Sequence, residues 1–293
     1  MRAAVVEGSR IEAASTVERG EPGGTPATPH AGGGERPLTV RDLSVRFGEH
    51  TVVEDLSLEV EQGELVAMVG PSGCGKSTTL NAICGLVRTG DAVTVTGDVE
   101  VPDGVRLAYA FQNDALLPWS TARRNVEVGA ELAGVPRSDR PRVATELLEQ
   151  VGLKGFDTRY PQQLSGGMRQ RVALARVLAY QPDLILMDEP FGALDAFIRM
   201  SLQNQLLDVW ARTRKTMVLV THDLTEALIL GTRVVVLSPS PGRVHRVVDN
   251  REWGEQRRAE TLRSTTPFLE KYKALWETMI ELGAAQRTGE EEQ

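Results

Sequence analysis

The chain has 293 residues, of which 41% are hydrophobic and 25% are charged, which is ordinary for a globular protein of one large or two modest domains. Its formal net charge of −7 argues against a general nucleic-acid binder, because phosphate backbones favour a basic protein surface. Two cysteines, Cys74 and Cys84, are too few for a disulfide framework and fit a reducing cytoplasm. No apolar run approaches the roughly 20 residues that span a bilayer, so we expect any membrane role to be peripheral.

The two ends of the chain differ in composition from the part between them. Nine of the fifteen residues at positions 20–34 are Gly or Pro, and such a stretch offers little apolar surface to bury. We therefore predict a disordered tail over residues 1–36, with a regulatory or docking role as the alternative. Residues 288–293 carry three glutamates and predict a short, loose acidic tail.

Apolar periodicity between the two tails predicts an α/β fold. The first strands are half-buried, since apolar side chains alternate there with polar ones; they contain Leu43, Val45 and Phe47, then Leu56, Leu58 and Val60. Four short continuous apolar runs follow, at residues 65–69, 184–187, 217–220 and 234–237. Runs of this length between helical segments predict buried strands of a parallel sheet that helices cover on both faces. Leu107, Tyr109 and Phe111 mark a further strand between the first two runs.

Helical character interrupts the sheet pattern after residue 112, with candidate helices at residues 126–133 and 143–151. We predict an inserted α-helical subdomain at about residues 113–165, within a main domain of residues 37–250. A C-terminal helical extension follows at residues 251–287. Its last helix is predicted to begin at Thr266 and Pro267, a favourable N-cap and first helical residue. Five apolar side chains on one face of this helix predict core packing or, alternatively, a dimer contact: Leu269, Tyr272, Trp276, Met279 and Ile280.

Residues 70–77 read Gly-Pro-Ser-Gly-Cys-Gly-Lys-Ser and fit the pattern G-x-x-x-x-G-K-S/T between a buried strand and a helical segment. Glycines let consecutive backbone amides turn inward around an anion, and the dipole of the following helix favours the same phosphates. Lys76 would reach the β- and γ-phosphates of a nucleotide, and the Ser77 hydroxyl would bind Mg²⁺. The expected ATP-binding residues here are Gly70, Pro71, Ser72, Gly73, Cys74, Gly75, Lys76, Ser77 and Thr78.

Two carboxylates, Asp188 and Glu189, follow the apolar run at residues 184–187. In a doubly wound sheet the carboxyl ends of the strands meet at the ligand crevice, so both acids would lie beside the phosphates. Asp188 would hold Mg²⁺, and Glu189 would polarise the attacking water as general base. The alternative is that both acids cap the next helix. His222 follows the run at residues 217–220 in the same way, and it would either contact the γ-phosphate and steady Glu189 or be structural.

Residues 164–170, Leu-Ser-Gly-Gly-Met-Arg-Gln, resemble the signature motif of the ATP-binding cassette (ABC) family. The resemblance covers roughly residues 38–248 and implies a P-loop NTPase with a RecA-like core that hydrolyses ATP. In this family the signature of one subunit faces the phosphate loop of its partner. The resemblance therefore implies a head-to-tail homodimer in which Ser165, Gly166 and Gly167 contact the partner's ATP. Met168 stands where most of the family has Gln, and this departure removes no phosphate contact.

The same resemblance implies roles for four further residues. Phe47 occupies the position of the aromatic residue that stacks on adenine, without the hydroxyl of the commoner Tyr. Gln112 resembles the glutamine that couples the metal site to the helical subdomain. Asp195 ends a segment, Gly-Ala-Leu-Asp, that resembles the loop crossing the dimer interface, and His222 matches the switch histidine. The implied catalytic set is Lys76, Gln112, Glu189 and His222, and the implied metal ligands are Ser77, Gln112 and Asp188.

Residues 111–119 and 238–243 resemble segments of importer ATPases for nitrate, aliphatic sulfonates, taurine and related solutes. The resemblance implies an importer subunit that uses ATP and Mg²⁺ and is peripheral on the cytoplasmic face of the cell membrane. Its partners would be integral permease subunits and an extracytoplasmic solute-binding protein, and no nucleic acid. Leu116, Leu117 and Trp119 would help form a groove for the permease or, alternatively, pack in the helical subdomain. A soluble ABC-type ATPase not coupled to transport and a nucleotide-sensing regulator are the other functional hypotheses.

Overall fold

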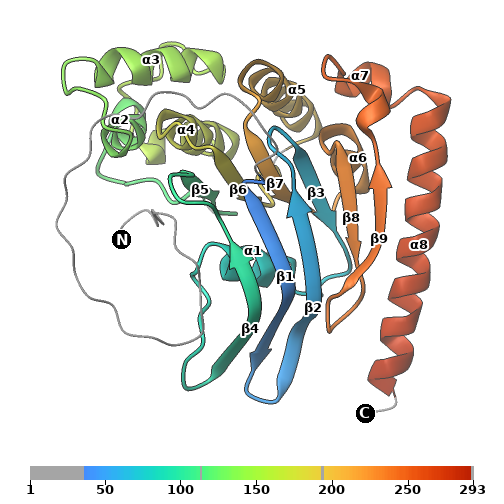
Figure 1. Cartoon of the computed structure of the whole chain (residues 1–293). Coiled ribbons are helices and arrows are strands. Elements are labelled where there is room, and N and C mark those ends of the chain that lie inside the picture. The colour runs from blue at the N-terminus through green and yellow to red at the C-terminus, as the bar shows by residue number, and fades with distance from the viewer. Residues whose placement is uncertain (1–35, 113, 193–194, 292–293) are drawn as a thin grey trace.

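The computed structural model describes residues 36–112, 114–192 and 195–291, with side chains through residue 284. Figure 1 shows the order of the elements along the chain. The predicted tail at residues 1–36 lies outside the described residues except for Arg36, and so do Asn113, Ala193 and Leu194. Among the described residues, no helix is both long enough and apolar enough to cross a bilayer.

Two β-sheets form the framework of the molecule (Figure 1). The smaller sheet is antiparallel and has the order β2-β1-β4, with β1 at Leu38–Phe47, β2 at His50–Val60 and β4 at Val93–Glu100. The larger sheet has the order β5-β6-β7-β3-β8-β9, made of Leu107–Ala110, Leu184–Asp188, Thr216–Val220, Leu65–Val69, Arg233–Leu237 and Val244–Asp249. Neighbouring strands run parallel from β5 to β8, and β9 is antiparallel to β8. The predicted α/β fold, with a parallel sheet and N-terminal antiparallel strands, is confirmed.

The continuous apolar runs form strands because both faces of the larger sheet are covered. In β3, Leu65, Ala67 and Val69 pack in one core with helices α5 (Ala196–Thr213) and α6 (Leu224–Leu230). Val66 and Met68 face the other core, with α1 (Lys76–Ile83) and the antiparallel sheet. Successive side chains of a strand point to opposite faces, so a strand covered on both sides needs apolar residues at every position.

A layer of three helices has a core of its own beside the ends of β5 and β6 (Figure 1). These helices are α2 at Ala122–Leu132, α3 at Arg140–Gln150 and α4 at Gly166–Ala179, with a 3-10 turn at Pro161–Gln163 before α4. α2 and α4 cross closely, because a Cβ added at Gly129 would lie 2.1 Å from the carbonyl oxygen of Arg176. Val172 and Ala175 of α4 are buried in this core, so the helical layer continues past residue 165, where the sequence placed its end.

The C-terminal extension consists of a 3-10 turn at Arg251–Trp253, α7 at Ala259–Leu262 and α8 at Thr266–Glu291. The predicted start of α8 is confirmed, whereas the predicted core packing of its apolar face is wrong for three of the five side chains. Phe268, Leu275 and Leu282 pack in the core, and Leu269, Trp276 and Ile280 are 55%, 52% and 55% exposed. Tyr272 and Met279 lie between these faces and are partly buried. Residues 288–291 are helical rather than a loose tail.

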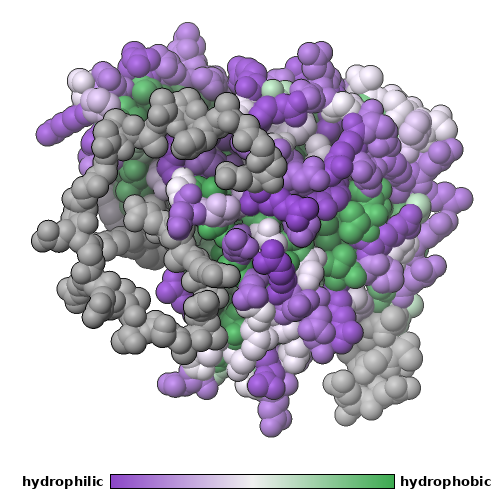
Figure 2. All heavy atoms as spheres, viewed as in Figure 1, coloured by the Kyte–Doolittle hydropathy of each residue, from purple (hydrophilic) through white to green (hydrophobic). Residues whose placement is uncertain are grey.

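The core face of α8 follows from the heptad spacing of its three buried residues. Seven residues make nearly two turns of an α-helix, so residues 268, 275 and 282 stand in one row. The exposed Leu269 and Trp276 each directly follow a buried residue of this row, so they lie about 100° further around the helix. Figure 2 shows a mostly hydrophilic surface with apolar side chains gathered over β9 beside α8. Val247 of this edge strand is 48% exposed there.

Candidate functional site

The loop at residues 70–75 connects β3 to α1, and three of its residues are glycines. Gly73 has a φ of 78° and Gly75, the N-cap of α1, has a φ of 89°. Only glycine adopts such angles without strain. A Cβ added at Gly75 would also lie 2.6 Å from Val53 Cγ2. The backbone of the loop therefore lies close to β2 and leads directly into the N-terminus of α1, a place that suits the phosphates of a nucleotide.

Lys76 is the first residue of α1 and is 8% exposed. Its Nζ donates hydrogen bonds to the carbonyl oxygens of Gly70 at 2.8 Å and Pro71 at 2.9 Å. The ammonium group is therefore held within the curve of the loop, where it favours phosphate oxygens. The same Nζ lies 3.8 Å from Cys74 Sγ. Burial raises the pKa of the Cys74 thiol, and the positive charge of Lys76 opposes that rise, so this buried cysteine stays a thiol.

Asp188 ends β6 and faces the start of α1. Its Oδ1 accepts a hydrogen bond from the Ser77 hydroxyl at 2.9 Å, and its Oδ2 accepts one from the Tyr109 hydroxyl at 3.3 Å. Asp188 is 8% exposed, and this burial raises its pKa while the two hydroxyls lower it. Burial and the nearby Asp188 charge also raise the pKa of Tyr109.

The hydroxyl of Ser77 and the carboxylate of Asp188 are oxygen ligands of the kind that Mg²⁺ prefers. Within the described part of the chain, no cluster of three or more His, Cys, Asp or Glu residues could hold a metal ion. Mg²⁺ sites in nucleotide-binding proteins are commonly completed by phosphate oxygens and water, with one or two protein ligands. The donor set at Ser77 and Asp188 therefore fits a magnesium ion that arrives with a nucleotide.

Two side chains that follow neighbouring strands contact the carboxylate of Glu189. His222 Nδ1 lies 3.2 Å from Glu189 Oε1, and Gln112 Nε2 donates to Glu189 Oε2 at 3.3 Å. The three residues come just after β7, β5 and β6, whose carboxyl ends adjoin because the strands are parallel neighbours. Glu189 has a φ of 45°, a left-handed conformation that is strained for a residue with a side chain. The alternative that the two acids cap α5 is wrong, since Asp195 is the N-cap of that helix.

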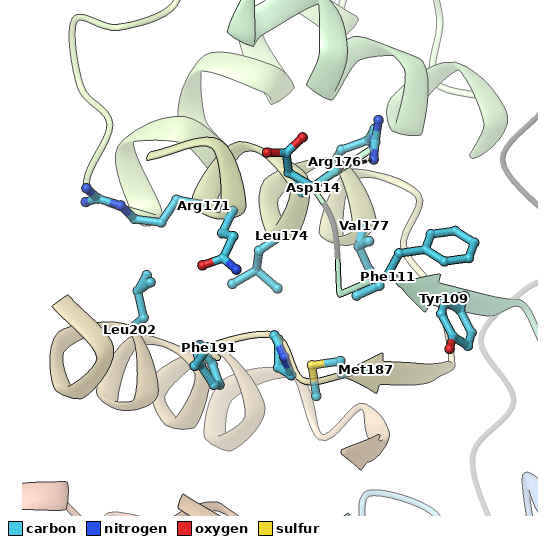
Figure 3. A pocket seen from close by; sticks show the side chains of 14 residues that line it. Tyr109, Phe111, Asp114, Arg171, Leu174, Arg176, Val177, Met187, Phe191 and Leu202 are labelled. Atoms are coloured by element: carbon cyan, nitrogen blue, oxygen red, sulfur yellow. Dashed lines mark hydrogen bonds between the residues drawn. The ribbon is translucent and has the colours of Figure 1, made fainter. Parts of the chain in front are cut away.

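A cavity of about 40 Å³ lies next to this group, between α4 and the ends of β5 and β6 (Figure 3). Phe111, Leu174 and Met187 are among its lining residues. The segment after Gln112 is anchored on α4 at the far side of the cavity. Asp114 Oδ2 accepts from Arg169 Nε at 2.8 Å, and the carbonyl oxygens of Asp114 and Ala115 accept from Arg176. These hydrogen bonds join the segment that follows Gln112 to α4.

The signature residues lie at the start of α4. Ser165 is the N-cap, and its hydroxyl accepts a hydrogen bond from the Met168 amide at 3.3 Å. Ser165 and Gly166 are exposed and Gly167 is buried. In the part of the chain that the structure describes, no hydrogen bond joins residues 165–167 to residues 70–78. The loop at residues 70–75 and the segment at residues 165–167 are thus two separate segments, each at the N-terminus of a helix.

The remaining predicted residues lie on several different elements. Phe47 ends β1 and is 40% exposed, and Asp195 is exposed and caps α5 through the amides of Phe197 and Ile198. The three residues predicted to form a groove for the permease differ in their exposure to solvent. Leu116 is buried in the core of the helical layer, as the alternative predicted, whereas Trp119 is 74% exposed. Leu117 is half-buried.

Two supporting residues were missed at the level of sequence. Tyr109 was assigned only to a strand, although its hydroxyl binds Asp188. Gly242 braces the phosphate loop, because a Cβ there would lie 2.0 Å from the carbonyl oxygen of Cys74. The amide of Gly242 also donates to the carbonyl oxygen of Val52 at 2.8 Å. The Pro-Gly turn at residues 241–242 was the available signal, but nothing local showed which loop it would contact.

Comparison with known proteins places the chain in a family. A family profile described as ABC transporter matches residues 53–192. The taurine import ATP-binding protein TauB of Escherichia coli O157:H7 is 47% identical over 209 residues, which cover 71% of this chain and 82% of that protein. TauB of Roseobacter denitrificans is 44% identical over 216 residues, which cover 71% of this chain and 80% of that protein.

Solved structures show the same architecture. A dimeric ATP-binding cassette in a post-hydrolysis state, bound to ADP and Pi, is 31% identical with a TM-score of 0.62, over 73% of this chain and 99% of that chain. A dimeric bacterial ABC transporter cassette is 33% identical with a TM-score of 0.62, over the same shares. The chain belongs to the ABC transporter family as an ATP-binding subunit, and it binds and hydrolyses ATP.

Proposed function

We propose that this subunit energises the import of a small sulfonate or a related organic or inorganic anion. The observation that carries the catalytic part is the convergence of Gln112 and His222 on the two carboxylate oxygens of Glu189, at 3.3 and 3.2 Å. The substrate class is supported by the similarity to the two taurine import proteins. The proposed substrate class includes nitrate and other small anions, because partner proteins rather than this chain would select the solute.

The phosphate loop would hold the nucleotide through residues 70–78. The amides around Gly73 and Gly75 surround the phosphates, Lys76 neutralises their charge, and Phe47 at the end of β1 stacks on the base. Ser77, Asp188 and the amide oxygen of Gln112 would be the protein ligands of Mg²⁺. When bound, this ion neutralises charge on the β- and γ-phosphates.

Glu189 would act as the general base. Its Oε1 and Oε2 are oriented by His222 and Gln112, so the carboxylate is fixed in position to accept a proton from the attacking water. His222 is 61% exposed on its side chain and can turn from Glu189 toward a γ-phosphate. Gln112 connects this site to α4 through the Asp114 segment.

A second copy of the chain would complete each site. Ser165, Gly166 and Gly167 of the partner subunit would contact the γ-phosphate from the opposite side, with the dipole of the partner's α4 directed at it. Asp195 would cross the interface near the two sites. The two phosphate-directed loops of one chain would then serve two different ATP molecules, which explains why no hydrogen bond of the described residues joins them.

The membrane partners would be permease subunits, with an extracytoplasmic solute-binding protein in the complex. The exposed Trp119 and the half-buried Leu117 follow the segment that Arg176 anchors on α4, and they would receive a short permease helix. The subunit would then be peripheral on the cytoplasmic face of the membrane. The net charge of −7 gives no reason to add nucleic acid as a partner.

The catalytic assignment is tested with Glu189→Gln. We expect kcat for ATP hydrolysis to fall at least about 100-fold, because the amide cannot take a proton, while ATP binding and dimer formation persist. Glu270→Gln, on the exposed side of α8, is the matched control and should hydrolyse ATP like the unmodified chain. Hydrolysis retained in Glu189→Gln would overturn the assignment of the base.

The transport assignment is tested with Trp119→Ala in a complex reconstituted with the permease and the binding protein. We expect the loaded binding protein to stimulate hydrolysis several-fold less, because an exposed aromatic anchor is lost. Hydrolysis by the isolated subunit should not change. Leu132→Ala, which removes an exposed apolar side chain from α2, is the control. Full stimulation in Trp119→Ala would favour a site of permease contact elsewhere on the subunit.

A further inference from the structure

Phe197 is an exposed aromatic side chain that the proposed mechanism does not use. It is 83% exposed, the largest exposed fraction among the large apolar side chains of the described residues. Its amide and that of Ile198 donate to Asp195 Oδ1 at 3.1 Å each, so the N-cap of α5 holds the turn at residues 195–197 in place. In the proposed homodimer Asp195 crosses the interface, so a second copy of the chain is the partner that Phe197 would contact. We call residues 195–197 the interface turn.

Arg199 joins the interface turn to the loop that carries His222. It stands one helical turn after Asp195, and its amide donates to the Asp195 carbonyl oxygen at 2.9 Å. Arg199 Nη1 donates to Asp223 Oδ2 at 3.0 Å, and Asp223 directly follows His222. A charge-assisted hydrogen bond thus connects the first turn of α5 to the loop of the histidine.

The two carboxylate oxygens of Asp223 have different partners. Its Oδ1 accepts from the amides of Thr225 at 2.8 Å and Glu226 at 3.1 Å, so it caps α6. Its Oδ2 accepts from Arg199. The residue after His222 is therefore held between α5 and α6, and a substitution can remove its charge while it keeps an oxygen for the cap.

The His222 loop contacts the acid of β6 and the helix that follows it at two places. His222 Nδ1 lies 3.2 Å from Glu189 Oε1, and Asp223 pairs with Arg199 of α5. The His222 side chain is 61% exposed, so its position depends mainly on the backbone of its loop. The ion pair between Arg199 and Asp223 fixes that backbone one residue away from the histidine.

We propose that Arg199 is a positioning residue for His222, and that its ion pair with Asp223 couples the interface turn to the catalytic site. The proposal rests on the proposed function, in which a second copy completes the site and His222 steadies the general base. A partner subunit packed on Phe197 fixes the first turn of α5. Arg199 then holds Asp223, and with it His222, in the position that reaches Glu189. Each subunit would thereby hydrolyse ATP fastest when its partner is in place.

The exposure of the ion pair separates this role from a role in stability. The side chains of Arg199 and Asp223 are each 28% exposed, and ion pairs in contact with solvent contribute roughly 0–1 kcal/mol to folding. Loss of the pair should therefore change kcat far more than the midpoint of thermal unfolding.

The first test compares Arg199→Ala with Arg199→Lys, which keeps the positive charge. We expect kcat for ATP hydrolysis to fall about tenfold in the alanine variant, since small displacements of a catalytic group are costly, with KM for ATP changed less than twofold. The lysine variant should recover at least a third of the normal kcat. Arg258→Ala breaks a different ion pair of α5, with Asp208 at 2.6 Å, and should hydrolyse ATP normally. Normal kcat in Arg199→Ala would overturn the proposal.

A double-mutant cycle tests whether Arg199 acts through Asp223. Asp223→Asn keeps a side-chain oxygen for the cap of α6 and removes the negative charge. We expect this variant to lose kcat like Arg199→Ala, and the double variant to lose no more than either single variant. Independent effects would multiply to a loss of about 100-fold, and that outcome would contradict an action through the ion pair.

Dimer formation is measured separately in chains that carry Glu189→Gln, by analytical ultracentrifugation with ATP. Phe197→Ala should weaken the dimer several-fold, because an exposed aromatic contact is lost, whereas Arg199→Ala should change its Kd less than twofold. Ile280→Ala removes an exposed apolar side chain of α8 and is the control. A dimer of normal affinity in Phe197→Ala would overturn the role of the interface turn. Equal weakening by Arg199→Ala would show that the ion pair acts in assembly and not on His222.

Two further variants distinguish a failure of this proposal from a failure of the proposed function. If Glu189→Gln or His222→Ala hydrolyses ATP normally, the proposed function fails. If both are inactive while Arg199→Ala is normal, only the role of Arg199 fails.

Discussion

At the amino end of the larger sheet, Glu64 Oε2 lies 2.8 Å from Arg233 Nη2 and its Oε1 lies 3.4 Å from Arg251 Nη2. At the carboxyl end, Asp188 and Glu226 of α6 are also buried, but Asp188 accepts hydrogen bonds from two hydroxyls and Glu226 accepts one from the amide of Gln203. Burial raises the pKa of both of these acids. Glu64 at one end of the sheet is thus paired with opposite charges, whereas Asp188 and Glu226 at the other end are buried carboxylates without an ion pair among the described residues.

The difference indicates that the amino end of the larger sheet contributes mainly to stability and the carboxyl end mainly to catalysis. Strain and desolvated charge cluster at functional sites and are offset by stability elsewhere. Glu189, with its left-handed backbone, belongs to the same end as Asp188 and Glu226. Substitutions at the carboxyl end should therefore change hydrolysis first, and substitutions at the amino end should change the free energy of unfolding first.

The largest effect is expected for Lys76→Ala at the carboxyl end. Loss of the ammonium removes a charge directed at the phosphates, and we expect kcat/KM for ATP to fall about 100- to 1,000-fold. Lys215→Ala is the matched change at the amino end, where Lys215 Nζ lies 3.4 Å from Asp183 Oδ1. That variant should hydrolyse ATP within twofold of the normal rate. Comparable losses in the two variants would remove the distinction between the ends.

Glu64→Ala should be the most destabilising of the changes at the amino end. It leaves Arg233 and Arg251 without their carboxylate, and since Arg251 is half-exposed we expect a loss of about 2–3 kcal/mol in the free energy of unfolding. Urea titration measures this loss, and kcat measured below the transition should be unchanged. A stable variant with impaired hydrolysis would contradict the comparison.

Glu226→Gln should stabilise the protein at pH 8. Burial raises the pKa of Glu226 in the folded chain from its ordinary value of 4.5 to about 7, so the folded chain binds the proton more tightly and stability falls as pH rises from 4.5 to 7. The glutamine variant avoids this loss, and we expect it to gain about 2 kcal/mol at pH 8. Its advantage should shrink toward zero near pH 4. A constant difference across this range would show that the charge of Glu226 is not its cause.

The smallest effect is expected for Thr232→Val at the amino end. The Thr232 hydroxyl donates to the carbonyl oxygen of Leu65 at 2.9 Å in the interior. Its loss should lower the free energy of unfolding by about 1 kcal/mol and leave the pH profile of hydrolysis unchanged. Thermal unfolding of this variant and of Thr232→Ser, which keeps the hydroxyl, gives the comparison. Equal stability of the two variants would show that the hydrogen bond contributes nothing.

Features that depend on neighbours along the chain were predictable. Three predictions rest on such local patterns. The structure has a loop where the spacing from Gly70 to Ser77 predicts one, and a strand end where acids follow a buried apolar run. It also has a helix that starts at Thr266. The strand ends at Gln112, Glu189 and His222 meet because parallel strands align their carboxyl ends. With this rule, the sequence alone predicts that these three residues lie close together, without any knowledge of side-chain packing.

Features that depend on contacts between distant segments were not predictable. Two apolar rows of α8 have similar composition, and the row with Leu275 is buried because it faces the core beside α6. Tyr109 binds Asp188, and Gly242 braces the loop at Cys74, across 79 and 168 positions respectively. The raised pKa of Glu226 has the same origin, since it results from burial between α5 and α6. Spacing along the chain therefore places the chemical groups, and three-dimensional packing decides which of them are buried and which are held by contacts with distant segments.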